Sequence, residues 1–68
     1  MEMDLRKVGR KLVSLRGARS RAEAADGIGI SVSALAMYEL GRRSPRDDIK
    51  IKIAQYYGTN VGKLFYCE

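Results

Sequence analysis

The sequence contains no histidine and only one cysteine, Cys67. Without histidine or a cysteine pair, it lacks the side chains that a structural zinc site needs. A single cysteine cannot form a disulfide within the chain, so the sequence is unlike a small secreted domain held together by disulfides. We therefore expect no metal and no cofactor, and a fold held together by its apolar core.

Long apolar runs are also missing. No stretch approaches the length of a membrane span, and the first six residues, Met-Glu-Met-Asp-Leu-Arg, lack the apolar segment of a signal peptide. The sequence therefore predicts a cytoplasmic protein without a membrane segment. Catalysis is not expected either, because no serine has an obvious base and the acidic pair Asp47-Asp48 is explained by the start of a helix.

The chain has a marked excess of positive charge. It has 68 residues, and 13 Lys and Arg against 8 Asp and Glu give a formal net charge of +5. This length suits one domain, residues 1–68, with little room for a deep cleft. A basic surface on a small domain favours a polyanionic partner, most often nucleic acid.

Helical signals follow one another along the whole chain. Apolar residues recur every three or four positions from Leu5 to Leu15, and Ser20 to Glu23 form a capping box. Gly29 permits a tight turn after the second helix, and Pro45 suits the start of the fourth. The sequence predicts an all-α, compact five-helix bundle with helices at about 4–16, 21–27, 32–40, 46–57 and 60–65.

The helix predicted over residues 32–40 has two different faces. At 100° per residue, one face carries Ala34, Leu35 and Tyr38, which we expect in the core. The opposite face carries Val32, Ser33, Ala36, Met37 and Leu40. On the first helix, by contrast, the charged residues Arg6, Lys7, Arg10 and Lys11 form a face that we expect to be solvated, with DNA contact as the alternative.

The residues from Ser20 onward resemble the Cro/repressor-type (xenobiotic-response-element) helix-turn-helix family. The matching segments are Ser20-Arg21-Ala22-Glu23-Ala24-Ala25, Ile28-Gly29-Ile30-Ser31, Tyr38-Glu39-Leu40-Gly41-Arg42-Arg43-Ser44-Pro45, Ile53-Ala54, Tyr57-Gly58 and Leu64-Phe65. The resemblance implies a lambda-repressor-like fold in a bacterial, phage or mobile-element protein. It also implies that residues 32–40 form the recognition helix, which enters the major groove of DNA.

The resemblance further implies roles for individual residues. The expected base contacts are Val32, Ser33, Ala36 and Met37. The expected phosphate contacts are Arg21, Arg42, Arg43 and Arg46, with Arg19 and Lys50 as weaker candidates. Glu39 is expected to form a structural ion pair with an arginine of the first helix, either Arg16 or Arg10.

Together these features predict a sequence-specific regulator of transcription that binds double-stranded DNA, most simply as a repressor. Relatives of this type bind as two-fold dimers, and Ile51, Tyr56, Phe65 and Tyr66 are candidate dimer contacts. The alternative is a helix-turn-helix-like protein-interaction module, such as an antitoxin or an anti-repressor adaptor. Few hydrogen-bonding groups on the outer face of residues 32–40 favour that alternative.

Overall fold

The computed structural model describes residues 3–66, and within that range the chain forms five helices and no strand. The helices are α1 (Leu5–Arg16), α2 (Arg21–Ile28), α3 (Val32–Glu39), α4 (Asp47–Tyr56) and the π-helical turn η1 (Gly62–Tyr66). This confirms the predicted all-α, five-helix bundle, and every boundary lies within two residues of the prediction. Cys67 lies outside the described residues.

Side-chain caps explain where most of these helices begin. The Asp4 carboxylate accepts from the backbone amides of Arg6 and Lys7 at 3.1 and 3.2 Å, at the start of α1. Ser20 and Ser31 accept from the amides three residues later, both at 3.0 Å, and so start α2 and α3. Each cap satisfies amides that the first turn of a helix leaves without a partner, which favours a helix starting there.

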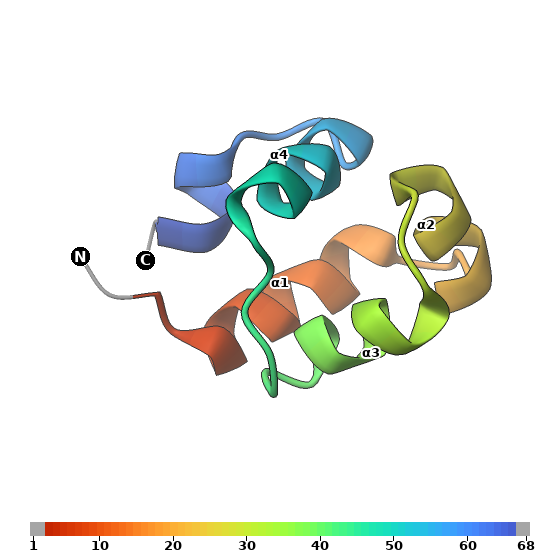
Figure 1. Ribbon diagram of the computed structural model, residues 1–68, viewed down its shortest axis with the longest axis horizontal. Coiled ribbons are helices and arrows are strands. Elements are labelled where there is room, and N and C mark those ends of the chain that lie inside the picture. The colour runs from red at the N-terminus through yellow and green to blue at the C-terminus, as the bar shows by residue number, and fades with distance from the viewer. Residues whose placement is uncertain (1–2, 67–68) are drawn as a thin grey trace.

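Helix α1 runs through the middle of the bundle (Figure 1) and contacts both α3 and η1. Helix α2 packs on α3 and α4, so the two helices of the motif, α2 and α3, form one side of the molecule. The buried core draws on all five helices: Val8, Leu12, Ala24, Ala25, Ile28, Leu35, Tyr38, Ile53, Ala54, Leu64 and Phe65. Its residues come mainly from the predicted apolar faces.

Two glycines let neighbouring helices approach closely. A Cβ on Gly9 of α1 would lie 2.3 Å from the backbone carbonyl oxygen of Glu39 in α3, so no larger residue fits between these helices. A Cβ on Gly27 of α2 would lie 2.3 Å from Cε1 of Tyr56. Gly27 is the penultimate residue of α2, where the absence of a side chain makes room for the tyrosine ring.

Candidate nucleic-acid interface

The outward face of α3 is exposed as the sequence predicted. Val32, Met37 and Leu40 keep 46%, 40% and 56% of their surface, Ser33 is exposed, and Ala36 is half-buried. The opposite face of α3 is fixed in the molecule, because Leu35, Tyr38 and Glu39 are buried. The expected base-contacting residues therefore share one accessible surface, and none of them is required for the core.

A tight turn fixes α3 relative to α2. Gly29 adopts a left-handed conformation with φ 91° and ψ 33°, which a glycine adopts without steric strain. The amides of Gly29 and Ile30 both donate to the carbonyl of Ala25, at 2.8 and 3.0 Å. Ser31 then caps α3. This is the geometry of a helix-turn-helix, with only three residues between the two helices.

An exposed basic loop follows α3. Arg42, Arg43 and Arg46 all lie in this loop and are exposed. The loop lies against the start of α1, because a Cβ on Gly41 would be 3.0 Å from the carbonyl oxygen of Leu5 and 3.1 Å from the Cα of Arg6. Of the three arginines expected to contact phosphates, Arg42 and Arg43 follow the C-terminal end of α3, and Arg46 is the N-cap residue of α4.

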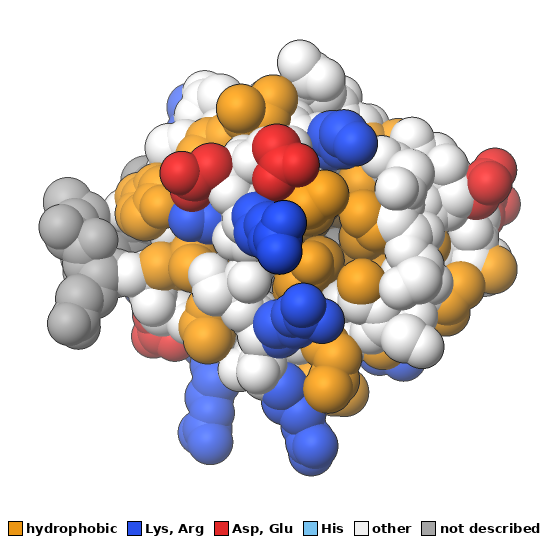
Figure 2. Space-filling model, viewed as in Figure 1, with side chains coloured by type: hydrophobic (Ala, Val, Ile, Leu, Met, Phe, Trp, Pro, Cys, Tyr) orange, Lys and Arg blue, Asp and Glu red, His pale blue; other side chains and the backbone are white. Residues whose placement is uncertain are grey.

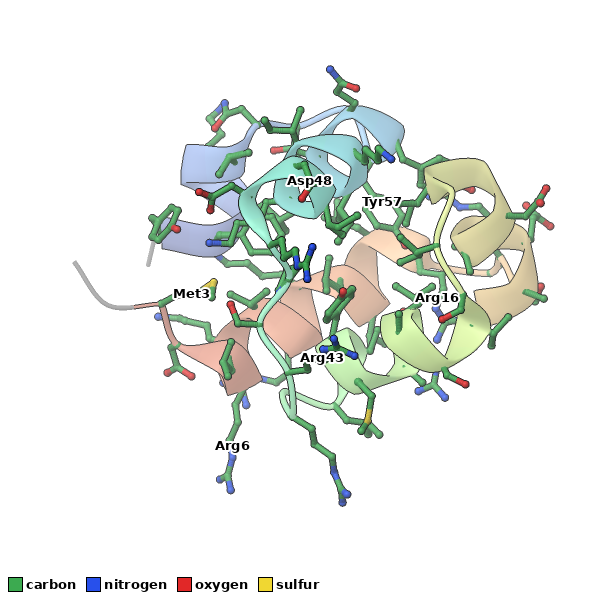
Figure 3. The ribbon with its side chains drawn as sticks, viewed as in Figure 1. Met3, Arg6, Arg16, Arg43, Asp48 and Tyr57 are labelled. Atoms are coloured by element: carbon green, nitrogen blue, oxygen red, sulfur yellow. The ribbon has the colours of Figure 1, made fainter. Side chains whose placement is uncertain are left out.

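Arg6 also lies near this loop, on the charged face of α1 for which solvation and DNA contact were both open. Its side chain is exposed and extends away from the molecule at the edge where α3 and the following loop lie (Figure 3). Figure 2 shows basic side chains projecting from the same edge, beside apolar surface. The packing of the loop, which brings Gly41 next to Arg6, distinguishes Arg6 from the other charged residues of that face.

Glu39 is the centre of a buried ionic cluster. Its carboxylate, which has no exposed surface, accepts hydrogen bonds from the Nε atoms of Arg16 and Arg21, each at 2.7 Å. Arg16 also donates to Glu39 through Nη2 at 3.3 Å and to the carbonyl of Arg19 at 2.7 Å. The hydrogen bond to Glu39 raises the pKa of Arg16. Of the two arginines considered as partners of Glu39, Arg16 is the one in contact, and Arg10 is exposed.

Arg21, which was expected to contact a phosphate, also forms an ion pair within the protein. Its Nε is bound to Glu39, but 40% of the side chain remains exposed. Because a guanidinium group has five N–H donors, the pair with Glu39 uses only part of its capacity. Arg21 can thus be held in place by the protein while its terminal nitrogens stay accessible.

Arg19 and Lys50 are both engaged within the protein. Arg19 donates to the carbonyls of Arg16 and Leu15, at 3.1 and 2.7 Å, and its guanidinium lies over the rings of Tyr56 and Tyr57. Lys50 is only 6% exposed. Either side chain would have to give up these partners to reach a phosphate, so both remain weaker candidates than the arginines of the loop.

The environment of Lys50 explains how a charge is tolerated there. Its Nζ donates to the hydroxyl of Tyr66 at 2.7 Å and lies 3.5 Å from Asp47. The hydrogen bond to Tyr66 raises the pKa of Lys50. Its position was visible in the sequence, since Lys50 is three and four residues before the buried Ile53 and Ala54 and therefore shares their helical face.

The four expected dimer contacts fall into two groups. Phe65 is 2% exposed and belongs to the core, so it cannot form a dimer surface in this fold, and Tyr56 is half-buried against Gly27. Ile51 and Tyr66 are exposed. The expectation for Phe65 is thus corrected, because both Leu64 and Phe65 of the π-helical turn η1 are buried in the core.

Residues 3–66 also lack the features of two other kinds of site. No helix in this range is long and apolar enough to cross a membrane. No three histidine, cysteine or acidic side chains in this range come together as metal ligands would.

Comparison with known proteins identifies the family. The family model for the helix-turn-helix matches residues 15–64, which cover the end of α1, all of α2, α3 and α4, and most of η1. No curated protein matches the chain. The match covers well over half of the sequence, including α2, the turn and α3. The chain belongs to the Cro/repressor-type helix-turn-helix family of DNA-binding domains.

Proposed function

We propose that this chain is a sequence-specific, double-stranded DNA-binding regulator of transcription that represses by occupying an operator. One observation carries the proposal: a face of α3 that is exposed and not needed for the core is followed directly by a loop with three exposed arginines. An α-helix with its side chains is about 10–12 Å across, which fits the major groove, about 12 Å wide. Helix α3 is therefore the element proposed to enter that groove.

The proposed base contacts are Val32, Ser33, Ala36 and Met37, which lie on the exposed face of α3. Ser33 can exchange a hydrogen bond with a base edge, and the apolar side chains can contact the methyl group of thymine. None of the four contributes to the buried core, so they are available for contacts with bases.

The proposed phosphate contacts are Arg42, Arg43 and Arg46 of the loop, together with Arg6 and Arg21. Arg21 lies in the first turn of α2, where backbone amides also point outward. Its ion pair with Glu39 keeps the guanidinium oriented before DNA binds, which reduces the entropy lost on binding. With five such contacts the logarithm of affinity is expected to fall steeply with the logarithm of salt concentration.

Repression by occupancy is simplest for a dimer on an inverted repeat. A two-fold dimer would place the two α3 helices about one helical turn, ~34 Å, apart on the DNA. Ile51 and Tyr66 are the exposed residues proposed to contribute to its surface. A regulator of this kind would act in the cytoplasm of a bacterial cell.

The proposal is tested by titrating a labelled random-sequence duplex with the protein at several salt concentrations, followed by selection of bound sites from a random duplex library. We expect salt-dependent binding to any duplex and enrichment of a sequence that contains two related half-sites. Failure to bind duplex DNA even at low salt would overturn the proposal.

The exposed apolar residues Val32, Met37 and Leu40 favour a second candidate function, a protein-interaction module. The arginines around them favour DNA, because a polyanion complements all of them at once. A stoichiometric protein complex through α3 without duplex binding would support this second function instead.

A further inference from the structure

The outward face of α3 is chemically unusual for a surface that contacts bases. Of its five side chains, Val32, Ala36, Met37 and Leu40 carry no strong hydrogen-bond donor or acceptor. Ser33 supplies the one hydroxyl. These residues span an arc of about 140° at 100° per residue, and the buried residues Leu35, Tyr38 and Glu39 lie outside it. No buried polar side chain of α3 can therefore turn to replace the missing groups.

The major groove offers one apolar group to such a surface. The edges of the four base pairs present acceptors, amino donors and, on thymine alone, a methyl group at C5. Apolar side chains cannot form hydrogen bonds with these acceptors and donors. When such side chains cover them, the base edges lose their hydrogen bonds to water, which costs free energy. The same side chains gain by covering a methyl group.

The arginines on the loop and at the start of α1 argue for DNA as the occupant of this face. Arg6, Arg42 and Arg43 are exposed, and the loop lies directly against the start of α1. An apolar protein partner would have to accommodate these charges at the edge of its contact. A DNA duplex brings phosphates to them and methyl groups to α3 in a single arrangement.

We propose that α3 selects DNA mainly by the C5-methyl groups of pyrimidines, so that its sites are rich in thymine and 5-methylcytosine substitutes for thymine. The inference rests on the proposed DNA-binding function and specifies what that site recognises. Val32, Ala36 and Met37 form the methyl-contacting surface. The difference in affinity between a selected site and random duplex DNA then depends more on the methyl groups than on the hydrogen-bonding edges of the bases.

The experiment begins with a site selected from a random duplex library and compares that site with copies in which deoxyuridine replaces thymidine. Uracil pairs with adenine as thymine does and lacks only the methyl group. We expect affinity to fall about fourfold for each methyl group that α3 covers, the factor for one buried methyl-sized group. Equal affinity of the thymine and uracil duplexes would overturn the inference.

A second substitution separates the methyl group from the rest of the base. At each sensitive position, the T·A pair is replaced by C·G and then by 5-methylcytosine paired with G. We expect cytosine to bind weakly and 5-methylcytosine to recover most of the affinity, although its exocyclic group is a donor where thymine has an acceptor. No recovery by 5-methylcytosine at any position would show that the hydrogen-bonding edge is recognised instead, which contradicts the inference.

Matched variants assign the effect to α3. Met37→Ala is expected to reduce the ratio of affinities for the thymine and uracil duplexes. Val13→Ala removes a similarly exposed apolar side chain from α1 and should leave that ratio unchanged. An unchanged ratio in Met37→Ala, Val32→Ala and Ala36→Ser alike would also overturn the inference.

The two proposals fail in different ways. If no duplex binds at low salt, the proposed function itself is wrong. If duplexes bind in a salt-dependent manner but no thymine-containing site is enriched, or the uracil copies bind equally well, only the methyl-based selection is wrong.

Discussion

The guanidinium of Arg16 donates to both carboxylate oxygens of Glu39, through Nε at 2.7 Å and through Nη2 at 3.3 Å. This pair joins the C-terminal end of α1 to the C-terminal end of α3, although the two residues are 23 positions apart. Arg21 adds a contact from α2 to the same carboxylate. A single buried acid thus links the three helices whose relative positions define the proposed interface.

Replacement of this acid should be costly. Glu39→Gln removes the negative charge and leaves two arginines side by side, so we expect the free energy of unfolding to fall by about 3 kcal/mol, as when one partner of a buried ion pair is removed. Urea denaturation measures this loss. Glu23→Gln removes the same charge from an exposed position on α2 and serves as the control. A similar stability for the two variants would contradict a structural role for Glu39.

The close approach of α1 and α3 gives a second prediction. Gly9→Ala would place a methyl group 2.3 Å from the carbonyl oxygen of Glu39, and because backbone lies on both sides, the helices must move apart. We expect a loss of at least about 2 kcal/mol, despite the better helix propensity of alanine. Gly62→Ala is the matched control, since its nearest neighbour would be Asn60 Oδ1 at 3.4 Å. Thermal unfolding of the two variants compares them directly, and a higher melting temperature for Gly9→Ala would contradict this account.

The hydroxyl of Tyr57 has no hydrogen-bond partner among the described residues, although it is buried. Tyr57→Phe removes this unsatisfied group, and we expect a gain of about 1 kcal/mol in stability, or an increase of about 4–8 °C in the melting temperature. Tyr38→Phe, at another buried ring, provides the comparison. A loss of stability in Tyr57→Phe would indicate that the hydroxyl does have a stabilising partner.

The same hydroxyl predicts a pH dependence. Burial raises the pKa of Tyr57, so above the ordinary tyrosine pKa, about 10, the unfolded chain loses this proton while the folded chain keeps it. Folding stability then decreases as pH rises from about 10 toward the folded-state pKa. The advantage of Tyr57→Phe over the wild type should therefore grow over this range, as measured by urea denaturation at pH 8 and above pH 10. A stability advantage of Tyr57→Phe that shrinks as pH rises would contradict a raised pKa for Tyr57.

The basic loop yields a prediction about DNA binding. Arg43→Ala should lower affinity for all duplexes alike and reduce the slope of log affinity against log salt by about 0.9. The combined replacement of Arg42, Arg43 and Arg46 should reduce the slope by about 2.7. Lys63→Ala removes one exposed charge beside Ser14 and Leu15, on the side of α1 turned away from α3, and should leave the slope unchanged. If the loop variants and Lys63→Ala gave equal slopes, the loop would not contact phosphates.

The helices themselves were predictable because their signals are local. Ser20 and Ser31 lie where they can cap the helices that follow, and Gly29 supplies the left-handed residue of the turn. These features act within four residues of one another, so they are visible in the sequence without knowledge of the packing. The exposed face of α3 followed from helical geometry alone.

Contacts between helices were harder to predict. The fit of Gly9 against Glu39 and of Gly27 against Tyr56 depends on how the helices cross, which the periodicity of a single helix does not determine. Arg6 reaches the proposed interface for the same reason.

The burial of Lys50 follows from its position on the same helical face as Ile53, which its charge alone does not indicate. A lysine on an apolar helical face buries its stem and needs a partner for its ammonium, which Tyr66 supplies.

The separation of α3 into a buried side and an unused outer side also makes this domain a suitable scaffold for new binding specificities. Because Leu35, Tyr38 and Glu39 hold the helix, a library randomised at Val32, Ser33, Ala36 and Met37 should consist largely of folded members. Selection from such a library would change the operator that is recognised without the need to redesign the bundle.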